Sequence, residues 1–266
     1  GIPIPKSFVF TDEKTLKENQ SKLTYPCVVK ASKSGPEFLR YCNSISELLD
    51  ACTTLSVKSG NDKILVQEYI RGPGHGFFAL YSNGTPLAIY MHERVLEYPP
   101  TGGPSAVAKS YHNEDLKRIG LKLLDALEWN GPAMVEVIRD ASSGEFKLIE
   151  INPKLWGSIN LTIASGVNIP QMIVDVCIDK NVETVFRWKE KQYRWSTTNE
   201  LLLLMAEPDI IRLKEFLFHP GELSNMDYGD PLPSLIQVVR SFARGFMLWH
   251  KGTMRAPSGI PAEAKQ

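Results

Sequence analysis

Three side chains with the oxygen ligands that hard metal ions prefer, those of Glu136, Glu150 and Asn152, occur in one short stretch of the sequence. Residues 133–139 and 146–151 have the composition of β-strands, and the Asp-Ala-Ser-Ser-Gly run between them is a turn signal. The stretch is therefore predicted to form a β-hairpin. Such a hairpin brings side chains that are separated in the sequence close together.

The predicted register decides where these three side chains point. Because side chains alternate between the two faces of a strand, Glu150 and Asn152 share one face. A pairing such as Asp140 opposite Phe146 then places Glu136 directly across from Glu150. We expect three oxygen ligands to converge on one face of the hairpin.

Two opposed carboxylates with Cβ atoms about 5 Å apart repel each other, and a bound cation or a proton relieves the repulsion. Magnesium takes one or two protein carboxylates and completes its shell with water and substrate phosphates, so this ligand set predicts a nucleotide nearby. The alternative is that Glu136 or Glu150 faces solvent. The bare pattern, taken alone, favours that alternative.

Two lysines, Lys30 and Lys33, are candidate ligands for phosphate. Lys30 ends a short apolar strand predicted at residues 25–30, and Lys33 lies in the small-residue loop 31–36 that follows it. A lysine at such a junction can contact phosphate oxygens while loop N–H groups bind the rest of the anion. For Lys30 alone, a side chain that simply extends to the surface is the favoured alternative.

The elements that position these residues follow from hydrophobic periodicity and turn signals. A glycine-rich break at residues 71–76 suggests a hinge, although a surface loop has the same composition. The irregular connection at residues 97–106 is long enough to be functional. We expect helices at 44–55, 114–129, 158–164 and 170–178, and further strands at 64–70, 77–81 and 86–95.

The C-terminal part has a different pattern. A basic and aromatic segment at 187–195 precedes helices expected near 199–205 and 209–217. A cationic amphipathic helix is expected at 234–249, and contact with a membrane surface or a partner is one interpretation of it. The favoured interpretation is that this helix packs its apolar side chains onto the main body. Those side chains are Leu235, Val238, Val239, Phe242 and Phe246.

Composition sets further limits. The 266 residues suffice for one large or two small domains, and 43% of them are hydrophobic, as in an ordinary globular protein. Thirty basic residues balance thirty acidic ones, so we expect no nucleic-acid partner. The four cysteines lack metal-ligand spacing, which favours a reducing cytoplasm. The longest apolar run, Leu201 to Ala206, is too short for a transmembrane segment.

Taken together, three segments resemble the ATP-grasp superfamily of carboxylate–amine ligases, which includes the ATP-binding domains of carbamoyl-phosphate synthase large subunits. They are the lysine-ending strand VVKAS, the segment VQEYIRGPG and the hairpin ending in EINPKLWGS, and the resemblance covers about residues 1–180. It implies an α+β, two-lobed fold with the nucleotide held between two antiparallel-sheet lobes. The implied organisation is a leading segment at 1–24, a small lobe at 25–70, a large lobe with the magnesium site at 71–190, and a helical C-terminal extension with a tail at 191–266.

The resemblance also implies roles for single residues, matched position by position. Lys30 contacts the nucleotide phosphates, with Lys33 in the loop that covers them. The residues Glu136, Glu150 and Asn152 hold Mg²⁺, for which Mn²⁺ is an alternative. The strand between the lobes meets adenine through its backbone at Gln67, Glu68, Tyr69 and Ile70.

Several positions depart from the family pattern. His75 stands about where relatives often have an acidic residue that binds the ribose, and it is retained as a candidate nucleotide contact. Lys154 replaces an arginine that follows Asn-Pro in many relatives. Arg94 is expected to contact the γ-phosphate or a substrate carboxylate, and Lys154 to assist it. Relatives usually begin with a separate α/β domain, so we expect a missing N-terminal domain, with a homodimer as the alternative.

The implied activity is ATP-dependent ligation. A substrate carboxylate attacks the γ-phosphate to give an acylphosphate and ADP, and an amine then forms an amide bond. The implied cofactors are ATP and Mg²⁺, and the implied partners are a small-molecule carboxylate and an amine. Two alternatives stay open: a non-catalytic ATP-binding or sensing module, and a bicarbonate-dependent enzyme that forms carboxyphosphate.

Overall fold

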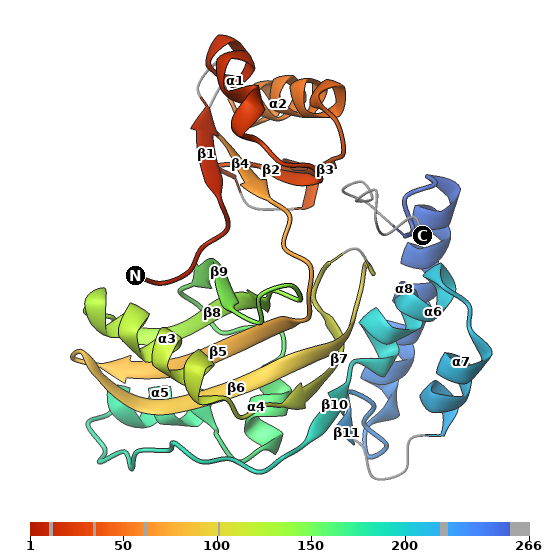
Figure 1. The fold of residues 1–266 in the computed structure, drawn as a ribbon. Helices are drawn as coiled ribbons and strands as arrows, with labels where there is room; N and C mark the ends of the chain where they lie inside the picture. Colours follow the sequence, from red (N-terminus) through yellow and green to blue (C-terminus); the bar gives the residue numbers. More distant parts are fainter. Residues whose placement is uncertain (11–12, 34–35, 61–62, 101, 219–222, 256–266) are drawn as a thin grey trace. The chain divides into compact units, whose positions relative to one another are not determined.

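The computed structural model of the protein describes residues 1–10, 13–33, 36–60, 63–100, 102–218 and 223–255 (Figure 1). The chain divides into two compact units. The smaller is built on Ile4–Ile70 and the larger on Arg71–His250. Each unit contains one of the two β-sheets.

The smaller unit is a four-stranded antiparallel sheet with two helices packed on it. Its edge strand β1, Ser7–Phe10, comes from the predicted leading segment and pairs with β4. The side chain of Ser44 accepts a hydrogen bond from the Glu47 N–H at 3.2 Å, which confirms the predicted helix start. Its elements are α1 Glu13–Asn19, β2 Cys27–Ala31, β3 Leu39–Cys42, α2 Ile45–Ser59 and β4 Ile64–Glu68, in the sheet order β1-β4-β2-β3.

The larger unit is organised on a seven-stranded sheet. Neighbouring strands are antiparallel, except for the short pair at one edge, β10 and β11, which is parallel. The order of the strands in the sheet is β11-β10-β7-β6-β5-β8-β9. In chain order, the strands are β5 Gly74–Ser82, β6 Thr85–Glu97, β7 Ser105–Ser110, β8 Gly131–Arg139, β9 Phe146–Asn152, β10 Gln192–Arg194 and β11 Leu223–Ser224.

Helices cover both faces of this sheet (Figure 1). Helix α3, Glu114–Ala126, buries Leu116 and Leu124 against one face. Helices α4, Ile159–Ala164, and α5, Ile169–Cys177, pack on the other face. The two faces of the sheet therefore belong to two different cores, and a residue's parity along a strand decides which core it enters.

The C-terminal part of the larger unit is helical, as predicted. One turn of π-helix at Ser196–Glu200 leads directly into α6, Leu201–Ala206, and is followed by α7, Ile210–Leu217, and α8, Pro231–His250. In the part of the chain that the structure describes, every helix is too short or too polar to cross a membrane.

The predicted packing of α8 is wrong. Four of the five predicted packing residues, Leu235, Val239, Phe242 and Phe246, are exposed and Val238 is half-buried. The buried residues are Ser234, Ser241 and Gly245. Small residues allow a close approach: a Cβ at Gly245 would lie 2.4 Å from Met205 Cε on α6. The periodicity was that of an amphipathic helix, but the packed face is the narrow stripe of small residues.

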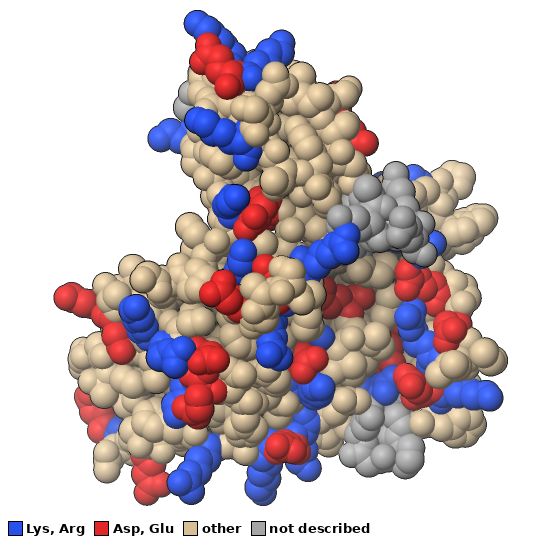
Figure 2. Space-filling view, in the orientation of Figure 1, with Lys and Arg blue, Asp and Glu red and all other residues tan. Residues whose placement is uncertain are grey.

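Charged side chains of both signs are interspersed over the visible surface of the larger unit (Figure 2). This mixture agrees with the balanced formal charge of the chain. A binding site for a charged ligand on the larger unit would therefore depend on a local cluster of charged side chains.

Candidate functional site

The β8–β9 hairpin brings the three predicted metal ligands together. Glu136 is paired directly opposite Glu150, and Met134 is paired opposite Asn152. Because Met134 and Glu136 share a face of β8, as Glu150 and Asn152 do of β9, all three ligand side chains lie on one face. The convergence predicted from the sequence is confirmed.

The register near the turn differs by one residue from the prediction. Arg139, not Asp140, pairs with Phe146, and a β-bulge between Glu136 and Val137 makes up the difference. The bulge leaves Ile149 as the extra residue in β9.

This bulge changes the parity of β9. Phe146 and Leu148 lie in the core beneath α3, and so does Ile151 beyond the bulge. In a regular strand Glu150 would share the face of Phe146 and Leu148 and would enter that core. The extra residue instead turns Glu150 onto the opposite face, where it meets Glu136.

The Asn152 amide bridges the two carboxylates. Its Nδ2 donates to Glu136 Oε1 at 3.2 Å and to Glu150 Oε1 at 2.7 Å. Rotation of the amide about its Cβ–Cγ bond would present Oδ1 in place of the nitrogen. The same side chain can therefore hold the two carboxylates by hydrogen bonds or join them as a third oxygen ligand.

Arg94 on β6 links this cluster to the loop that follows its strand. Its Nη2 donates to Glu136 Oε2, and its Nη1 donates to the Gly103 carbonyl oxygen at 3.2 Å and lies 3.6 Å from Glu97 Oε1. Glu97 Oε2 in turn accepts from the Gly103 N–H at 3.3 Å. The arginine is thus held by one carboxylate of the cluster and by both ends of the 97–103 loop.

Glu97 and Gly103 were not among the predicted site residues. Glu97 follows Arg94 by three positions at the end of a strand, which is a spacing that sequence patterns do not flag. A missing side chain makes the contact possible, because a Cβ at Gly74 on the neighbouring strand would lie 2.8 Å from Glu97 Oε1 and 3.1 Å from Arg94 Cδ. The glycine-rich segment therefore makes room for the Arg94–Glu97 contact.

Partial burial changes the proton affinity of the cluster. Burial raises the pKa of Glu136, the Arg94 guanidinium opposes that change, and the Glu150 carboxylate adds to it. For Arg94, burial lowers the pKa, but the Glu136 and Glu97 carboxylates outweigh it and the pKa is raised. The arginine stays charged, and Glu136 holds a proton more readily than an exposed glutamate.

His75 does not lie with these residues. It alternates with Gly74 and Gly76 on β5 and so points to the opposite face, where its ring is 4.6 Å from that of Tyr111 and 5.3 Å from that of Phe146. Only 2% of the residue is exposed, and burial lowers the pKa of its imidazole. The prediction of a nucleotide contact by this side chain is corrected: His75 is a core residue.

The remaining candidate of the larger unit is Lys154, whose side chain is less constrained by its surroundings than those of the hairpin residues. Lys154 is exposed in the segment that follows β9. Neither the sheet nor any described helix contains it. Its role at a transferring phosphoryl group stays a prediction.

The predicted phosphate and adenine ligands belong to the smaller unit. Lys30 is half-buried near the end of β2, where it pairs with Leu39 and Leu65, and Lys33 is exposed beyond that strand. The strand was predicted to end at Lys30, and in the structure it extends one residue further, to Ala31.

The predicted adenine segment makes hydrogen bonds inside the smaller unit. The Gln67 amide donates to Ser7 Oγ at 3.0 Å, and Ile70 is buried. The Glu68 N–H donates to the Lys6 carbonyl at 2.9 Å and the Tyr69 N–H to the Pro26 carbonyl at 3.3 Å. Adenine could bind these two N–H groups only if those bonds broke. The contact of this segment with adenine stays a prediction.

The acidic hairpin has the chemistry of a magnesium site. Among the residues that the structure describes, no group of three or more His, Cys, Asp or Glu side chains is placed to hold a metal ion. Glu136, Glu150 and Asn152 offer two carboxylates and one amide oxygen instead. This donor set fits Mg²⁺, which needs few protein ligands when substrate phosphates supply the rest.

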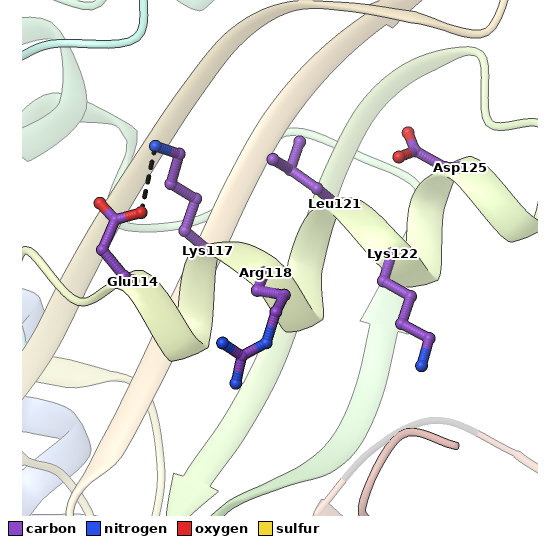
Figure 3. A pocket seen from close by; sticks show the side chains of 6 residues that line it. All are labelled: Glu114, Lys117, Arg118, Leu121, Lys122 and Asp125. Atoms are coloured by element: carbon purple, nitrogen blue, oxygen red, sulfur yellow. Dashed lines mark hydrogen bonds and ion pairs between the residues drawn. The ribbon is translucent and has the colours of Figure 1, made fainter.

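A surface hollow of about 530 Å³ lies elsewhere, over the exposed side of α3 (Figure 3). Its lining is charged, and a Lys117–Glu114 ion pair of 3.4 Å spans part of it. The Arg118 and Lys122 side chains extend away from the helix axis and not toward a common point (Figure 3). This is a solvated helix face, and it lacks the convergent polar groups of a ligand site.

The chain has the α+β ATP-grasp fold, as predicted. The chain belongs to the ATP-grasp family described as "ATP-grasp in the biosynthetic pathway with Ter operon", whose sequence profile matches residues 61–200, more than half of the chain.

Two curated relatives carry different activities. The α subunit of mitochondrial methylcrotonoyl-CoA carboxylase from Rattus norvegicus is 23% identical over 172 residues, which are 58% of this chain and 23% of that protein. The D-alanine–D-alanine ligase of Ruminiclostridium cellulolyticum is 25% identical over 213 residues, 70% of this chain and 53% of that protein. The chain thus spans about a quarter of one relative's length and about half of the other's.

A solved structure supports the fold. The biotin carboxylase domain dimer of Hydrogenobacter thermophilus 2-oxoglutarate carboxylase, in complex with MgADP, ADP and bicarbonate, matches with a TM-score of 0.58 at 18% identity. The match covers 70% of this chain and 44% of that one.

Proposed function

We propose that this protein is an ADP-forming ligase that activates a small-molecule carboxylate with ATP and joins it to an amine. Membership of the ATP-grasp family supports the ATP-dependent part of this proposal. The proposed residue roles rest on the geometry of the hairpin and on the order of the lysine strand, the adenine segment and the acidic hairpin along the chain.

The observation that carries the proposal is the direct opposition of Glu136 and Glu150 with Asn152 beside them. Two carboxylates placed in this way cost free energy unless a cation or a proton lies with them. Glu136, Glu150 and Asn152 would hold Mg²⁺, which when bound neutralises phosphate oxygens and orients the nucleotide.

The other residues would act by positioning and by charge. Lys30, assisted by Lys33, would neutralise the α and β phosphates, and Gln67–Ile70 would hold adenine through backbone groups. Arg94, with Lys154, would steady the transferring phosphoryl group. Because Arg94 already binds Glu136 and the Gly103 carbonyl, we expect it to couple the acidic cluster to the 97–103 loop.

The reaction balances without a protein nucleophile. A carboxylate oxygen of the substrate attacks the γ-phosphorus, and the bond from this phosphorus to the β–γ bridging oxygen breaks, which releases ADP. The amine nitrogen then attacks the acyl carbon, inorganic phosphate leaves, and the proton of the amine passes to solvent. The protein's share is to bring three phosphates and a carboxylate together against their mutual repulsion.

A second candidate is an enzyme that forms carboxyphosphate from bicarbonate. It is favoured by the similarity to a methylcrotonoyl-CoA carboxylase subunit and to a carboxylase domain whose structure contains bicarbonate. A non-catalytic ATP-binding module is the third. We further propose a cytoplasmic location, and either a homodimer or a preceding α/β domain as the source of the rest of the substrate site.

One experiment separates the three. Phosphate release from ATP and Mg²⁺ is measured with no addition, with a panel of amino acids and dipeptides, and with bicarbonate. Release that needs a carboxylate and an amine together supports the ligase, and release with bicarbonate alone supports the carboxyphosphate enzyme. ATP binding without release under every condition, in a chain extended by any preceding domain, supports the non-catalytic module and overturns the ligase.

A further inference from the structure

Helix α8 presents a broad apolar face to the outside of the larger unit. Leu235 is 60% exposed, Phe246 66% and Trp249 68%, which are high values for large apolar side chains of a folded protein. The other exposed apolar residues of the helix are Leu232, Ile236, Val239, Phe242 and Met247.

These exposed side chains form one continuous face. At 3.6 residues per turn they occupy a sector roughly 160° wide around the helix axis. The buried residues Ser234, Ser241 and Gly245 lie on the opposite side. Ser241 donates to the Thr197 carbonyl of the π-turn, Gly245 packs against α6, and Ser234 Oγ accepts from the Asp227 N–H. The amphipathic pattern of the helix is thus turned outward, and the contact with its own fold is made by small side chains.

The charge of the helix limits what can cover this face. Arg240 and Arg244 are exposed along one flank of the apolar sector. No aspartate or glutamate occurs between Pro231 and Arg255. Two copies of α8 placed face to face would bring arginines together without a carboxylate from either helix, so the charge favours an anionic surface over a second copy.

We propose that α8 lies in the headgroup region of an anionic lipid bilayer, with Phe242, Phe246 and Trp249 inserted and Arg240 at the lipid phosphates. A helix with a wide apolar face, aromatic side chains and a cationic flank has the composition of an interfacial anchor. A peptide groove needs walls of matching shape, whereas a bilayer can bind a single exposed helix face. Because the helix cannot cross a membrane, it rests on the surface.

This anchor does not depend on the ligase proposal. The acidic hairpin and α8 belong to different segments of the larger unit, so variants can test them separately.

The test is flotation of the full chain with extruded vesicles. One set contains equal amounts of phosphatidylglycerol and phosphatidylcholine, and the other contains phosphatidylcholine only. We expect at least about tenfold tighter binding to the anionic vesicles, weakened by high salt because exposed charges are screened. Phe242→Ser combined with Phe246→Ser should weaken binding at least about tenfold, and Arg240→Glu should reduce the preference for anionic lipid. Arg244 is kept, because its charge acts on the buried Tyr98.

The matched control is Ile210→Ser combined with Ile211→Ser on α7. These residues are 65% and 66% exposed, and this exposed fraction is similar to that of Phe246. Their replacement should leave vesicle binding unchanged. Circular dichroism and thermal unfolding confirm that each variant is folded. Absence of binding to either vesicle, equal binding to both, or equal loss in the α7 control would overturn the proposal. So would a concentration-dependent dimer that the phenylalanine variants abolish, since a second copy would then be the occupant.

Discussion

Two of the arginine–glutamate pairs in the larger unit, Arg194–Glu200 and Arg94–Glu136, differ in almost every respect except residue type. Arg194 donates to both carboxylate oxygens of Glu200, and Ser196 Oγ donates to the same carboxylate at 3.1 Å. The side chains of Arg194 and Glu200 are 5% and 0% exposed. This pair is balanced in charge, and neighbouring protein groups donate hydrogen bonds to both oxygens of the Glu200 carboxylate.

The pair of Arg94 and Glu136 is neither balanced nor closed. One arginine is placed among three carboxylates, those of Glu136, Glu150 and Glu97. The side chains of Arg94 and Glu136 are 15% and 20% exposed, so solvent and ligands can reach them. The excess of negative charge is what a scaffold would avoid and what a cation site requires. Two similar ion pairs can therefore be told apart by what is left unneutralised around them.

The largest expected effect is a loss of stability when the buried Arg194–Glu200 pair is broken. Arg194→Met should lower the free energy of unfolding by about 3–5 kcal/mol, because it leaves the Glu200 carboxylate buried without its partner. Chemical denaturation measures this change. The double variant Arg194→Met with Glu200→Leu should recover most of the lost stability, and a single variant as stable as the wild type would contradict the scaffold role.

Glu150→Gln tests the open cluster. Magnesium-dependent turnover should fall at least about a hundredfold, since one of two carboxylate ligands is lost, while stability should be unchanged or higher because repulsion with Glu136 is removed. Turnover and thermal unfolding are measured together. The matched control is Glu145→Gln in the exposed turn of the same hairpin. An unchanged rate in Glu150→Gln would remove this residue from the site.

Arg94→Ala should reduce turnover by about tenfold to a hundredfold and nucleotide affinity by less, because the arginine is proposed to act on the transferring group. Steady-state kinetics and calorimetry give the two values. Arg118→Ala, in the exposed charged face of α3, is the control. A larger loss in affinity than in turnover would argue against contact with the transferring phosphoryl group.

The pH dependence of magnesium binding sharpens the same comparison. The folded protein holds the pKa of Glu136 above its usual value, chiefly because of burial. Its protonated form therefore stabilises the fold at low pH, and this contribution is lost as the pH rises through the raised pKa. Magnesium needs the carboxylate, so its affinity should fall as the pH is lowered through that pKa. Calorimetric titrations should show the fall beginning above the usual carboxylate range near about pH 4; a fall confined to lower pH would contradict this assignment.

Lys30→Ala carries the smallest expected change. Its side chain is half-buried in the smaller unit, and loss of one phosphate contact should weaken ATP binding by about fivefold to tenfold. Isothermal titration calorimetry with a non-hydrolysable ATP analogue measures the affinity. Lys63→Ala, an exposed lysine just before β4, is the control. Equal affinity in both variants would return Lys30 to the role of a surface residue.

Much of this architecture could be predicted from local patterns. The hairpin, the caps of α2 and α3 and the opposition of Glu136 to Glu150 depend on strand alternation and capping residues within short segments. Alternation along β5 also predicts which residues share a face with His75, although both faces of this strand are buried. His75 shares its parity on β5 with Phe77, Ala79 and Tyr81, which are core residues.

Other features depend on partners that no local pattern names. The contacts of Arg94 to Glu97 and Gly103 need a loop to fold back onto its own strand. The outward face of α8 depends on a close approach to Met205, which the periodicity of the helix alone cannot show. The bulge at Ile149 is visible in the sequence only as a change of parity in the apolar pattern, from Phe146 and Leu148 to Ile151.

That extra residue in β9 has a consequence for exchanging parts between relatives. It divides the strand into two stretches whose inward positions are out of step, one that fills the core under α3 and one that carries ligands. A hairpin transplanted from a homologue with an uninterrupted strand would have to be joined at Ile149. A strand that kept Phe146 and Leu148 in the core but lacked the extra residue would turn its acidic residue toward the interior.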